Sequence, residues 1–353
     1  MKKIEDVIRS VGPEEEAARQ AAKRRWDAVA KPLGSLGCFE DALIRIAALR
    51  GSADFNLENK ALIVFCADNG VVAQGVSQCG SEVTAKVAVA LAEGRSTANT
   101  MAKRASCRVI PIDLGMKDFP GHPGVRNLRV RNGTGDISLG PAMTREECLA
   151  SMERGAALVE ELAASGTELI AIGEMGIGNT TTAAALTAAL LGLGPETVIG
   201  RGAGLSTDGL QRKREAVCRA LRVNHPNRDD VIGLIADLGG LDIAAMCGAF
   251  LGAAACRVPA VIDGMISAAA SLCAQRLCPA AAAAMLASHV STEPAGRLLL
   301  DALGLHAPLD AGMHLGEGTG ALMLMPLLDM AWEVYHSGQD FERLGIEAYR
   351  PLS

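Results

Sequence analysis

One glycine-rich stretch combines an acid, an amide and three hydroxyls within ten residues, Gly173-Glu174-Met175-Gly176-Ile177-Gly178-Asn179-Thr180-Thr181-Thr182. It lies between an aliphatic run at 169–172 and an alanine-rich, helix-like run at 183–191. Glycines let the backbone approach an anion, and the start of a helix presents free N–H groups and the positive end of its dipole. The stretch is neither a Walker A loop nor a complete G-x-G-x-x-G fingerprint. An ordinary turn with Asn or Thr as helix cap is the alternative, but the threonines and the neighbouring acid favour a phosphate site.

A second glycine-rich stretch surrounds a single acid, Leu315-Gly316-Glu317-Gly318-Thr319-Gly320-Ala321, just before a helix-like run at 322–328. Glycines free the backbone to place the carboxylate of Glu317 in a crevice, and apolar neighbours would raise its pKa toward a value useful to a general base. The alternative is a turn in which Glu317 is solvated or caps the helix. Because the chain contains two such strand-to-helix turns, a functional site formed by both is as good an explanation as an ordinary turn.

Other candidates are weaker taken singly. Lys213, in the basic run 211–214, could meet an anion or a developing charge, although such runs are usually solvated helix faces. Asp263-Gly264 could touch a ribose, but an acid that ends a strand is as often a helix cap. The six histidines show no ligand spacing, so no metal site is expected. Ordinary turns or caps could equally explain the stretches 31–37, 68–70 and 77–84.

Composition excludes several classes of protein. The 353 residues include 34 basic and 40 acidic residues, a net charge of -6, which is not the basic excess of a nucleic-acid binder. Aromatic residues make up only 3%, too few for a base-stacking platform. The ten cysteines are scattered without a C-x-x-C pair and predict reduced core thiols in a cytoplasmic protein. No signal peptide and no membrane-spanning run is expected.

The elements that must position these residues follow an alternating pattern. Short aliphatic runs end in acid or glycine clusters and are followed by helix-like segments, which predicts a Rossmann-like α/β fold with a parallel sheet covered on both faces. Ligands in such sheets bind beyond the carboxyl ends of the strands, where the polar clusters fall. Residues 1–30 predict amphipathic helices broken at Gly12-Pro13, residues 116–145 a long loop, and the aromatic tail after Leu328 terminal helices. The expected strands are 61–65, 108–112, 169–172, 231–236 and 258–262.

Taken together, the motifs resemble those of the nicotinate-nucleotide:5,6-dimethylbenzimidazole phosphoribosyltransferases of cobalamin synthesis. The order and spacing match from about residue 31 to the tail. The segments that carry the resemblance are Asp68-Asn69-Gly70-Val71-Val72, Gly75-Val76-Ser77, Glu82-Val83-Thr84, Pro141-Ala142-Met143-Thr144, Gly176-Ile177-Gly178-Asn179-Thr180-Thr181, Gly239-Gly240-Leu241-Asp242-Ile243-Ala244, Asp263-Gly264, Ser288-His289 with Glu293-Pro294, and Gly316-Glu317-Gly318-Thr319-Gly320.

The resemblance implies a homodimer without a cofactor. Each chain would have a large α/β domain at 30–328 and a small helical domain from 1–29 together with 329–353. The substrates would be nicotinate mononucleotide and an aromatic base, with no nucleic acid or membrane as partner.

Site roles are also implied by the resemblance. Glu317 would be the general base, with attack from the face opposite nicotinate, and Glu174 and Lys213 would assist catalysis. The base would be held without aromatic side chains. Implied phosphate- and ribose-binding residues are Gly176, Ile177, Gly178, Asn179, Thr180, Gly202 and Asp263, and implied base-binding residues are Ser77, Ser81, Lys86, Met175, Leu315 and Leu36.

Three departures from the family pattern lie on the side expected to hold the base. Asn69 stands where many members carry His, Gln78-Cys79-Gly80-Ser81 replaces a Tyr-Pro-Gln stretch, and Lys86 replaces a glutamine. The acceptor could therefore be dimethylbenzimidazole, another benzimidazole, adenine or a phenol. The alternatives to this activity are a non-catalytic nucleotide-binding relative, a nucleoside phosphorylase or another phosphoribosyltransferase.

Overall fold

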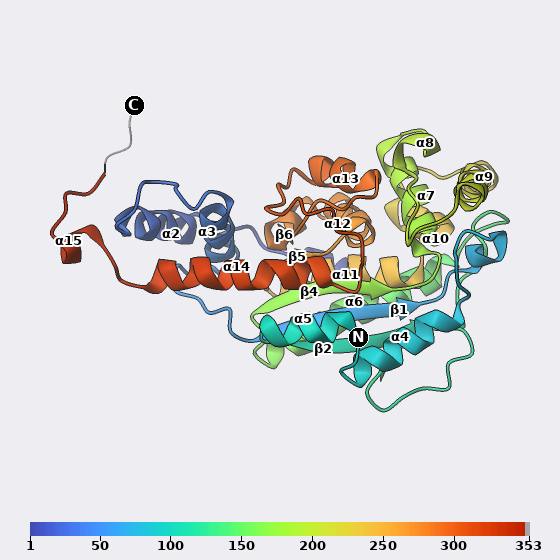
Figure 1. Cartoon of the computed structure of the whole chain (residues 1–353), viewed down its shortest axis with the longest axis horizontal. Coiled ribbons are helices and arrows are strands. Elements are labelled where there is room, and N and C mark those ends of the chain that lie inside the picture. Colours follow the sequence, from blue (N-terminus) through green and yellow to red (C-terminus); the bar gives the residue numbers. More distant parts are fainter. Residues whose placement is uncertain (350–353) are drawn as a thin grey trace.

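A parallel sheet organises the chain. Within residues 1–349, which the computed structural model describes, six strands lie in the order β3-β2-β1-β4-β5-β6 (Figure 1). From β1 the chain builds the sheet outward through β2 and β3, and then returns to add β4, β5 and β6 on the other side of β1. The expected Rossmann-like α/β fold is confirmed, with the strand order reversing between β1 and β4. The strands are β1 (Lys60–Ala67), β2 (Cys107–Gly115), β3 (Arg126–Asn127), β4 (Leu169–Met175), β5 (Ala260–Ile262) and β6 (Met285–Ala287).

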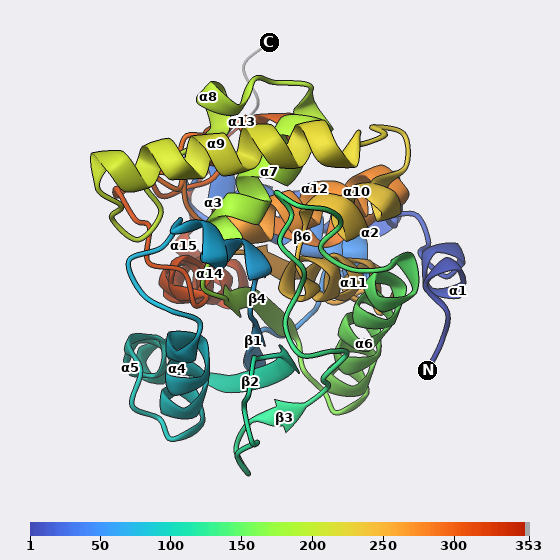
Figure 2. The ribbon, with the colours of Figure 1, turned by 90° about the vertical axis from the view of Figure 1, so that its right-hand side faces the viewer.

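Both faces of the sheet are covered by helices. Alternate side chains of the fully buried strand β1 enter different cores, Ile63 and Phe65 on one face and Leu62 and Val64 on the other. Figure 2 shows α4 (Glu82–Ala92) and α5 (Thr97–Arg104) on one side of the sheet and α6 (Arg145–Ala164) on the other. Two-sided burial explains why the strand reads as a continuous apolar run rather than an alternating one.

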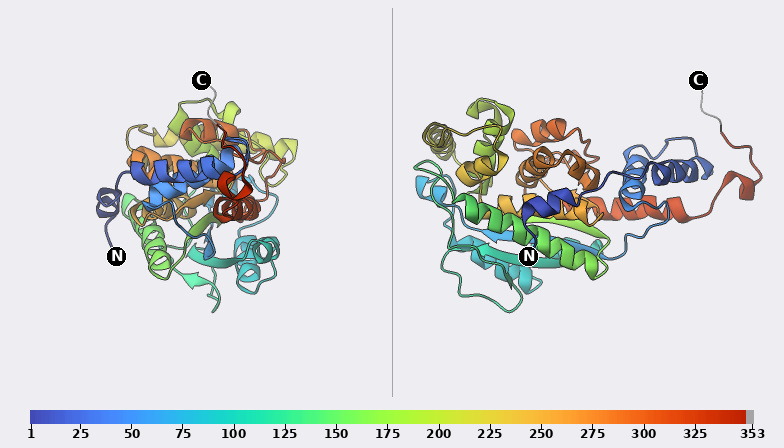
Figure 3. Two further views of the ribbon diagram at one scale, coloured as in Figure 1. Left: turned by 90° about the vertical axis from the view of Figure 1, so that its left-hand side faces the viewer. Right: turned by 180° about the vertical axis from the view of Figure 1, so that it is seen from behind.

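The helices fall into two layers and an outer group. The first core includes α1 (Ile4–Arg9), which lies against α6 and α11 (Figure 3), and also α6 (Arg145–Ala164), α7 (Asn179–Leu191), α10 (Val231–Leu238), α11 (Leu241–Ala255) and α12 (Met265–Leu277). The second includes α2 (Glu16–Ala28), α3 (Cys38–Arg50), α4 (Glu82–Ala92), α5 (Thr97–Arg104) and α14 (Thr319–His336). The outer group is α8 (Pro195–Val198), α9 (Thr207–Asn224), α13 (Ala295–Leu303) and α15 (Phe341–Leu344), with 3-10 turns η1 (Gly70–Gln74) and η2 (Pro279–Ala284). All of these except α15 also contribute buried residues to the first core.

One predicted strand is wrong. Residues 231–236 belong to the helix α10, not to the sheet. The side chain of Asp230 caps this helix by accepting a hydrogen bond from the N–H of Gly233 at 3.0 Å. A short aliphatic run has the same appearance in a buried strand and a buried helix, and here the cap and the buried positions Leu234, Ile235 and Leu238 follow the helical period. Strands β3 and β6 are not among the predicted strands, because β3 consists of two polar residues and β6 directly follows an alanine-rich run.

The aromatic tail packs on the N-terminal helices. The ring centroid of Tyr335 on α14 lies 5.1 Å from that of Trp26 on α2 and 5.9 Å from that of Phe55. Helix α14 begins beside the sheet and runs past residue 328 without a break to reach α3. The division into 30–328 and a terminal domain stays a prediction. Of the described helices, none has the length and apolarity that crossing a membrane requires.

Helices α6 and α11 approach each other through glycines, which gives a test of the core. A Cβ at Gly248 would lie 1.9 Å from the carbonyl oxygen of Met152, so backbone would have to move. We expect Gly248→Ala to lower the free energy of unfolding by about 1–3 kcal/mol, because overpacking strain exceeds the gain in helix propensity. Urea denaturation of the variant and the parent measures this difference in the free energy of unfolding. Gly140→Ala is the control, because a Cβ there would meet no atom within 4 Å. Equal midpoints for both variants would contradict the close packing.

Candidate active site

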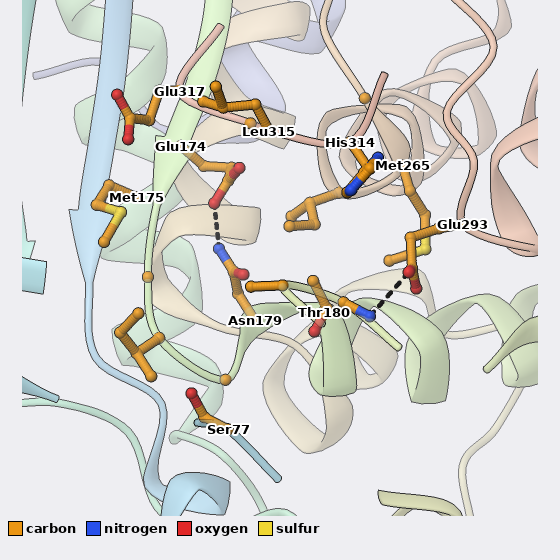
Figure 4. A pocket seen from close by; sticks show the side chains of 18 of the residues that line it. Ser77, Glu174, Met175, Asn179, Thr180, Met265, Glu293, His314, Leu315 and Glu317 are labelled. Carbon is orange, nitrogen blue, oxygen red and sulfur yellow. Dashed lines mark hydrogen bonds between the residues drawn. The ribbon is translucent and has the colours of Figure 1, made fainter. Parts of the chain in front are cut away.

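A cavity of about 350 Å³ opens beyond the carboxyl ends of the central strands. Its walls come from the end of β4, the start of α7, the loop after α8, the end of β5 and the loop before α14. Figure 4 shows Glu317 and Met175 at one end of this cavity and Thr180 and Glu293 at the other. The cavity lies where the strand order reverses, the usual ligand position in such sheets.

The Thr180 end is suited to an anion. Helix α7 begins at Asn179 after Gly178, whose φ of 94° is in the left-handed region that glycine adopts readily. Lys213, fully buried on α9, donates from Nζ to Thr180 Oγ1 and to the Gly200 carbonyl, each at 3.1 Å. Burial lowers the pKa of Lys213 to about 8. A helix N-terminus backed by a buried cation can bind a phosphate.

Neighbouring elements fix the loop that precedes α7. The side chain of Asn69, at the end of β1, donates to the carbonyl oxygen of Ile177 at 3.4 Å, and Thr84 Oγ1 on α4 accepts from the Ile177 N–H at 3.2 Å. Asn69 therefore supports the phosphate side of the cavity in this chain.

Two buried carboxyl groups share one amide in the middle of the site. Asn179 Nδ2 donates to Glu174 Oε2 and, at 3.0 Å, to Asp242 Oδ2. Burial is the main reason that the pKa of Glu174 rises to about 8 and that of Asp242 to about 6, and repulsion from Asp242 adds to the shift of Glu174. This raised pKa favours the protonated form of Glu174.

Glu317 occupies a left-handed backbone conformation, with φ of 57° between Gly316 at 87° and Gly318 at 78°. For a residue with a Cβ this conformation costs about 1–2 kcal/mol, so the surroundings must hold it there. Its Oε2 is buried and has no hydrogen-bond partner among residues 1–349, and burial followed by the nearby charge of Asp263 raises its pKa. A carboxylate with an unpaired oxygen and a raised pKa is suited to accept a proton.

The wall beside Glu317 is largely apolar. Met175 and Leu315 lie there (Figure 4), and the segment Ser77–Cys79 forms another edge of the cavity. The side chain of Gln78 donates to the carbonyl oxygen of Gly204, which ties this edge to the loop on the phosphate side. A flat aromatic ring fits such a wall without an aromatic partner.

Most of the predicted site residues meet in this cavity. Three predicted base-binding residues do not line it: Leu36, Ser81 and Lys86. Lys86 is exposed on α4, Ser81 lies at the N-terminus of that helix, and the N–H of Leu36 donates to Glu40 Oε1 at 2.8 Å. The predicted residues that do line the cavity are Ser77, Glu174, Met175, Gly176, Ile177, Gly178, Asn179, Thr180, Gly202, Asp263, Leu315 and Glu317, with Lys213 directly behind Thr180.

The loop near Leu36 borders a different cavity, of about 690 Å³, between α2, α3 and Tyr349. Its walls include Trp26, Leu33 and Ile44 but no residue from a strand end. The base-binding roles of Leu36, Ser81 and Lys86 stay predictions. The fold of a single chain does not place these three residues in the first cavity.

Sequence reasoning gave no role to three residues that the fold places at the site. Asp242 holds Asn179, His289 lies beside Asp263, and Glu293 Oε1 accepts a hydrogen bond from the Gly202 N–H at 2.8 Å. Each belongs to a segment that carries the family resemblance. The partners are distant along the chain, 63 residues for Asp242 and 91 for Glu293, so local spacing alone could not connect them.

Comparison with known proteins agrees with this geometry. A family model described as phosphoribosyltransferase matches residues 11–346. The nicotinate-nucleotide–dimethylbenzimidazole phosphoribosyltransferase of Acetivibrio thermocellus is 41% identical over 345 residues, covering 98% of each chain, and that of Thermus thermophilus is 42% identical over 326 residues, covering 92% of this chain and 97% of the other. The crystal structure of CobT from Thermus thermophilus superposes with a TM-score of 0.89 at 41% identity, covering 94% of this chain and all of that one.

The raised pKa of Glu174 predicts a pH dependence of stability. Between the ordinary value of 4.5 and about 8, the folded protein keeps a proton on Glu174 that the unfolded chain has released. Stability therefore falls as pH rises through this window. Glu174→Gln has no carboxyl group at this position and therefore lacks this contribution to the pH dependence. Between about pH 5 and pH 8 its free energy of unfolding should fall by about 1 kcal/mol less than that of the parent, or by a still smaller amount; 1 kcal/mol is about the equivalent of one pKa unit. Urea denaturation at the two pH values measures it.

The matched control for this measurement is Glu58→Gln, at an exposed position. It should keep the pH slope of the parent. Identical slopes for Glu174→Gln and the parent would mean that Glu174 is ionised in the folded protein.

Proposed function

The chain belongs to the nicotinate-nucleotide–dimethylbenzimidazole phosphoribosyltransferases, and from this premise we propose how its cavity works. It transfers the 5-phosphoribosyl group of nicotinate mononucleotide to dimethylbenzimidazole or a related base, in the assembly of the cobalamin lower ligand. The products are α-ribazole 5′-phosphate and nicotinate. One observation carries the proposal: a single cavity has an anion-binding helix start at one end and the unpaired carboxyl oxygen of Glu317 at the other.

The phosphate of nicotinate mononucleotide occupies the Thr180 end. Gly178 and Thr180, at the start of α7, offer backbone N–H groups, and the ammonium of Lys213 supplies the positive charge. A dianionic phosphate also stabilises the charged form of Lys213 and so raises its pKa from the lowered value of the empty cavity.

The transfer needs one base and no external acid. A ring nitrogen of the acceptor attacks C1′ of the ribose, and the bond from C1′ to the pyridinium nitrogen breaks with its electron pair, so nicotinate leaves without a proton. The other ring nitrogen of the acceptor loses its proton to Glu317. Attack from the face opposite nicotinate inverts C1′ and gives the α configuration.

Glu174 stabilises the positive charge of the reacting ribose. Its raised pKa favours the protonated form, but a pyridinium or oxocarbenium charge beside it favours the ionised form. A carboxylate that forms in a dry site next to a developing cation stabilises the transition state more than it would in water.

The acceptor lies between the apolar wall of Met175 and Leu315 and the edge at Ser77. The unusual Asn69 contacts the loop before α7 and Lys86 lies outside the cavity, so neither substitution touches the proposed position of the base. The segment Gln78–Cys79 is the one departure that borders it. Adenine and phenols remain acceptors to be tested beside dimethylbenzimidazole.

The decisive experiment measures nicotinate release from nicotinate mononucleotide with a panel of azoles, purines and phenols. We expect acceptor-dependent release by the parent enzyme. Glu317→Ala should bind nicotinate mononucleotide almost as the parent does and turn over about 100-fold more slowly or worse, the scale of a lost general base.

Glu58→Gln, on the surface, should keep full activity. Equal turnover of Glu317→Ala and the parent would remove Glu317 as the base. Failure of every acceptor tried would refute the transferase and favour a binding protein.

We also propose that the enzyme is a cytoplasmic homodimer. Its ten cysteines are free thiols, as expected in a reducing compartment. Met323, Met330 and Val334 are 47%, 58% and 36% exposed and lie on one face of α14, at spacings of seven and four residues. Such a stripe on one helix suits a contact between two copies of the chain.

Sedimentation at micromolar concentration should give a dimer. Met330→Glu should shift the distribution toward monomer, because it places a charge in the contact. Leu139→Glu, at another exposed apolar residue, is the control and should leave the dimer intact. A parent that sediments as a monomer would refute the proposal.

A further inference from the structure

The loop that carries Glu317 contacts Gly173 on β4, Asp263 at the end of β5 and His289 in the segment after β6. We propose that Asp263, backed by His289, is a positioning residue that fixes Glu317 in the geometry needed to take the proton of the incoming base. This inference rests on the proposed role of Glu317. It gives Asp263 a task beyond the ribose contact expected from sequence.

The carboxylate of Asp263 binds the backbone that follows Glu317. Oδ2 accepts a hydrogen bond from the Gly318 N–H at 3.0 Å, and Oδ1 accepts from the N–H groups of Gly320 at 2.7 Å and Ala321 at 3.3 Å. These amides begin α14, so a buried side chain at the end of β5 caps a helix that is distant in the sequence. Asp263 therefore satisfies the free N–H groups of that helix and fixes its first turn beside the cavity.

The left-handed conformation of Glu317 needs such a constraint. A strained residue persists only where the surrounding structure over-determines it. Thr319 Oγ1 donates to the Gly316 carbonyl at 2.8 Å and closes the turn from one side. On the other side the loop lies directly on β4, where a Cβ at Gly173 would be 2.6 Å from the Gly318 nitrogen. With Asp263 holding the Gly318 N–H, the backbone on both sides of Glu317 is anchored.

His289 completes the support from the segment that follows β6. A Cβ at Gly320 would lie 1.9 Å from His289 Nδ1, so the ring fills the space beside the first turn of α14. Ser288 Oγ donates to the Asp263 carbonyl at 3.0 Å and lies 3.1 Å from His289 Nδ1. Burial raises the pKa of Asp263, and His289 opposes that rise. The imidazole thus favours the carboxylate form, which can accept all three amide hydrogens.

The anchor and the phosphate end use different elements. Lys213 and the start of α7 hold the anion, whereas the bonds from Asp263 go to the loop of Glu317. Loss of the anchor should therefore affect proton transfer much more than binding of nicotinate mononucleotide. Displacement of a reacting group by about 1 Å can cost about 100-fold in rate.

Asp263→Asn tests the proposal. Both oxygens of the Asp263 carboxylate accept backbone N–H groups, whereas the asparagine side chain has only one oxygen, so its NH2 group must face at least one backbone N–H without bonding to it. We expect kcat to fall about 100-fold while KM for nicotinate mononucleotide changes less than about threefold. Hydrogen exchange at the amides of Gly318, Gly320 and Ala321 should accelerate. In a Glu317→Gln background, the added Asp263→Asn should change kcat by less than about threefold, since the group that it positions is already absent.

Asp301→Asn, exposed on α13, is the control and should behave as the parent in every measurement. His289→Gln serves as a milder variant if Asp263→Asn folds poorly, with a smaller loss of kcat that also disappears in the Glu317→Gln background. Losses that multiply in the double variant, or a change confined to KM, would overturn the proposal and leave Asp263 as a substrate contact.

The amide exchange separates this proposal from the proposed function. A parent that transfers phosphoribose to no acceptor would refute the function, yet faster exchange at Gly318–Ala321 in Asp263→Asn would still show that Asp263 holds the loop. An active parent with unchanged exchange and unchanged kcat in Asp263→Asn would refute the positioning role alone.

Discussion

Removal of carboxyl groups from water is the physical effect on which the rest of this site depends. Glu174, Asp242, Asp263 and Glu317 all lie where burial raises their pKa values, and they are close enough to oppose each other's ionisation. A cation that enters such a cluster favours the ionised form of the acids. In the proposed function, nicotinate mononucleotide supplies this cation as its pyridinium ring.

The sheet makes this concentration of acids tolerable. Its central strands are covered on both faces, so polar groups of the chain can gather only at the strand ends. There each acid has a specific donor: Asn179 for Glu174 and Asp242, and the first turn of α14 for Asp263. Glu317 is the exception, with one oxygen left unpaired among the described residues. Glu293 Oε2, at the other end of the cavity, is also unpaired among residues 1–349, and of these two groups Glu317 is the one that we propose as the proton acceptor.

Much of this could be predicted from local sequence. The anion loop at 176–180, the glycine-flanked Glu317 and four of the five expected strands follow from residue type and spacing, and the family resemblance is confirmed over nearly the whole chain. The failures have physical causes. Residues 231–236 form a helix because buried strands and buried helices share an aliphatic composition, and the short β6 carries almost no signal. Leu36 belongs to a predicted motif, but the fold places its loop beside a different cavity from the one that contains Glu317.

By itself, the sequence determined which residues can do chemistry here, since glycine placement, acid content and helix starts are local properties of the chain. Only the tertiary structure decided which of them act together. Asp263 and Gly320 are 57 residues apart, and no local pattern encodes a contact over that distance. The pKa of Glu174 likewise depends on side chains from four separate segments and on the exclusion of water, which exist only after the sheet has brought its strand ends to one edge.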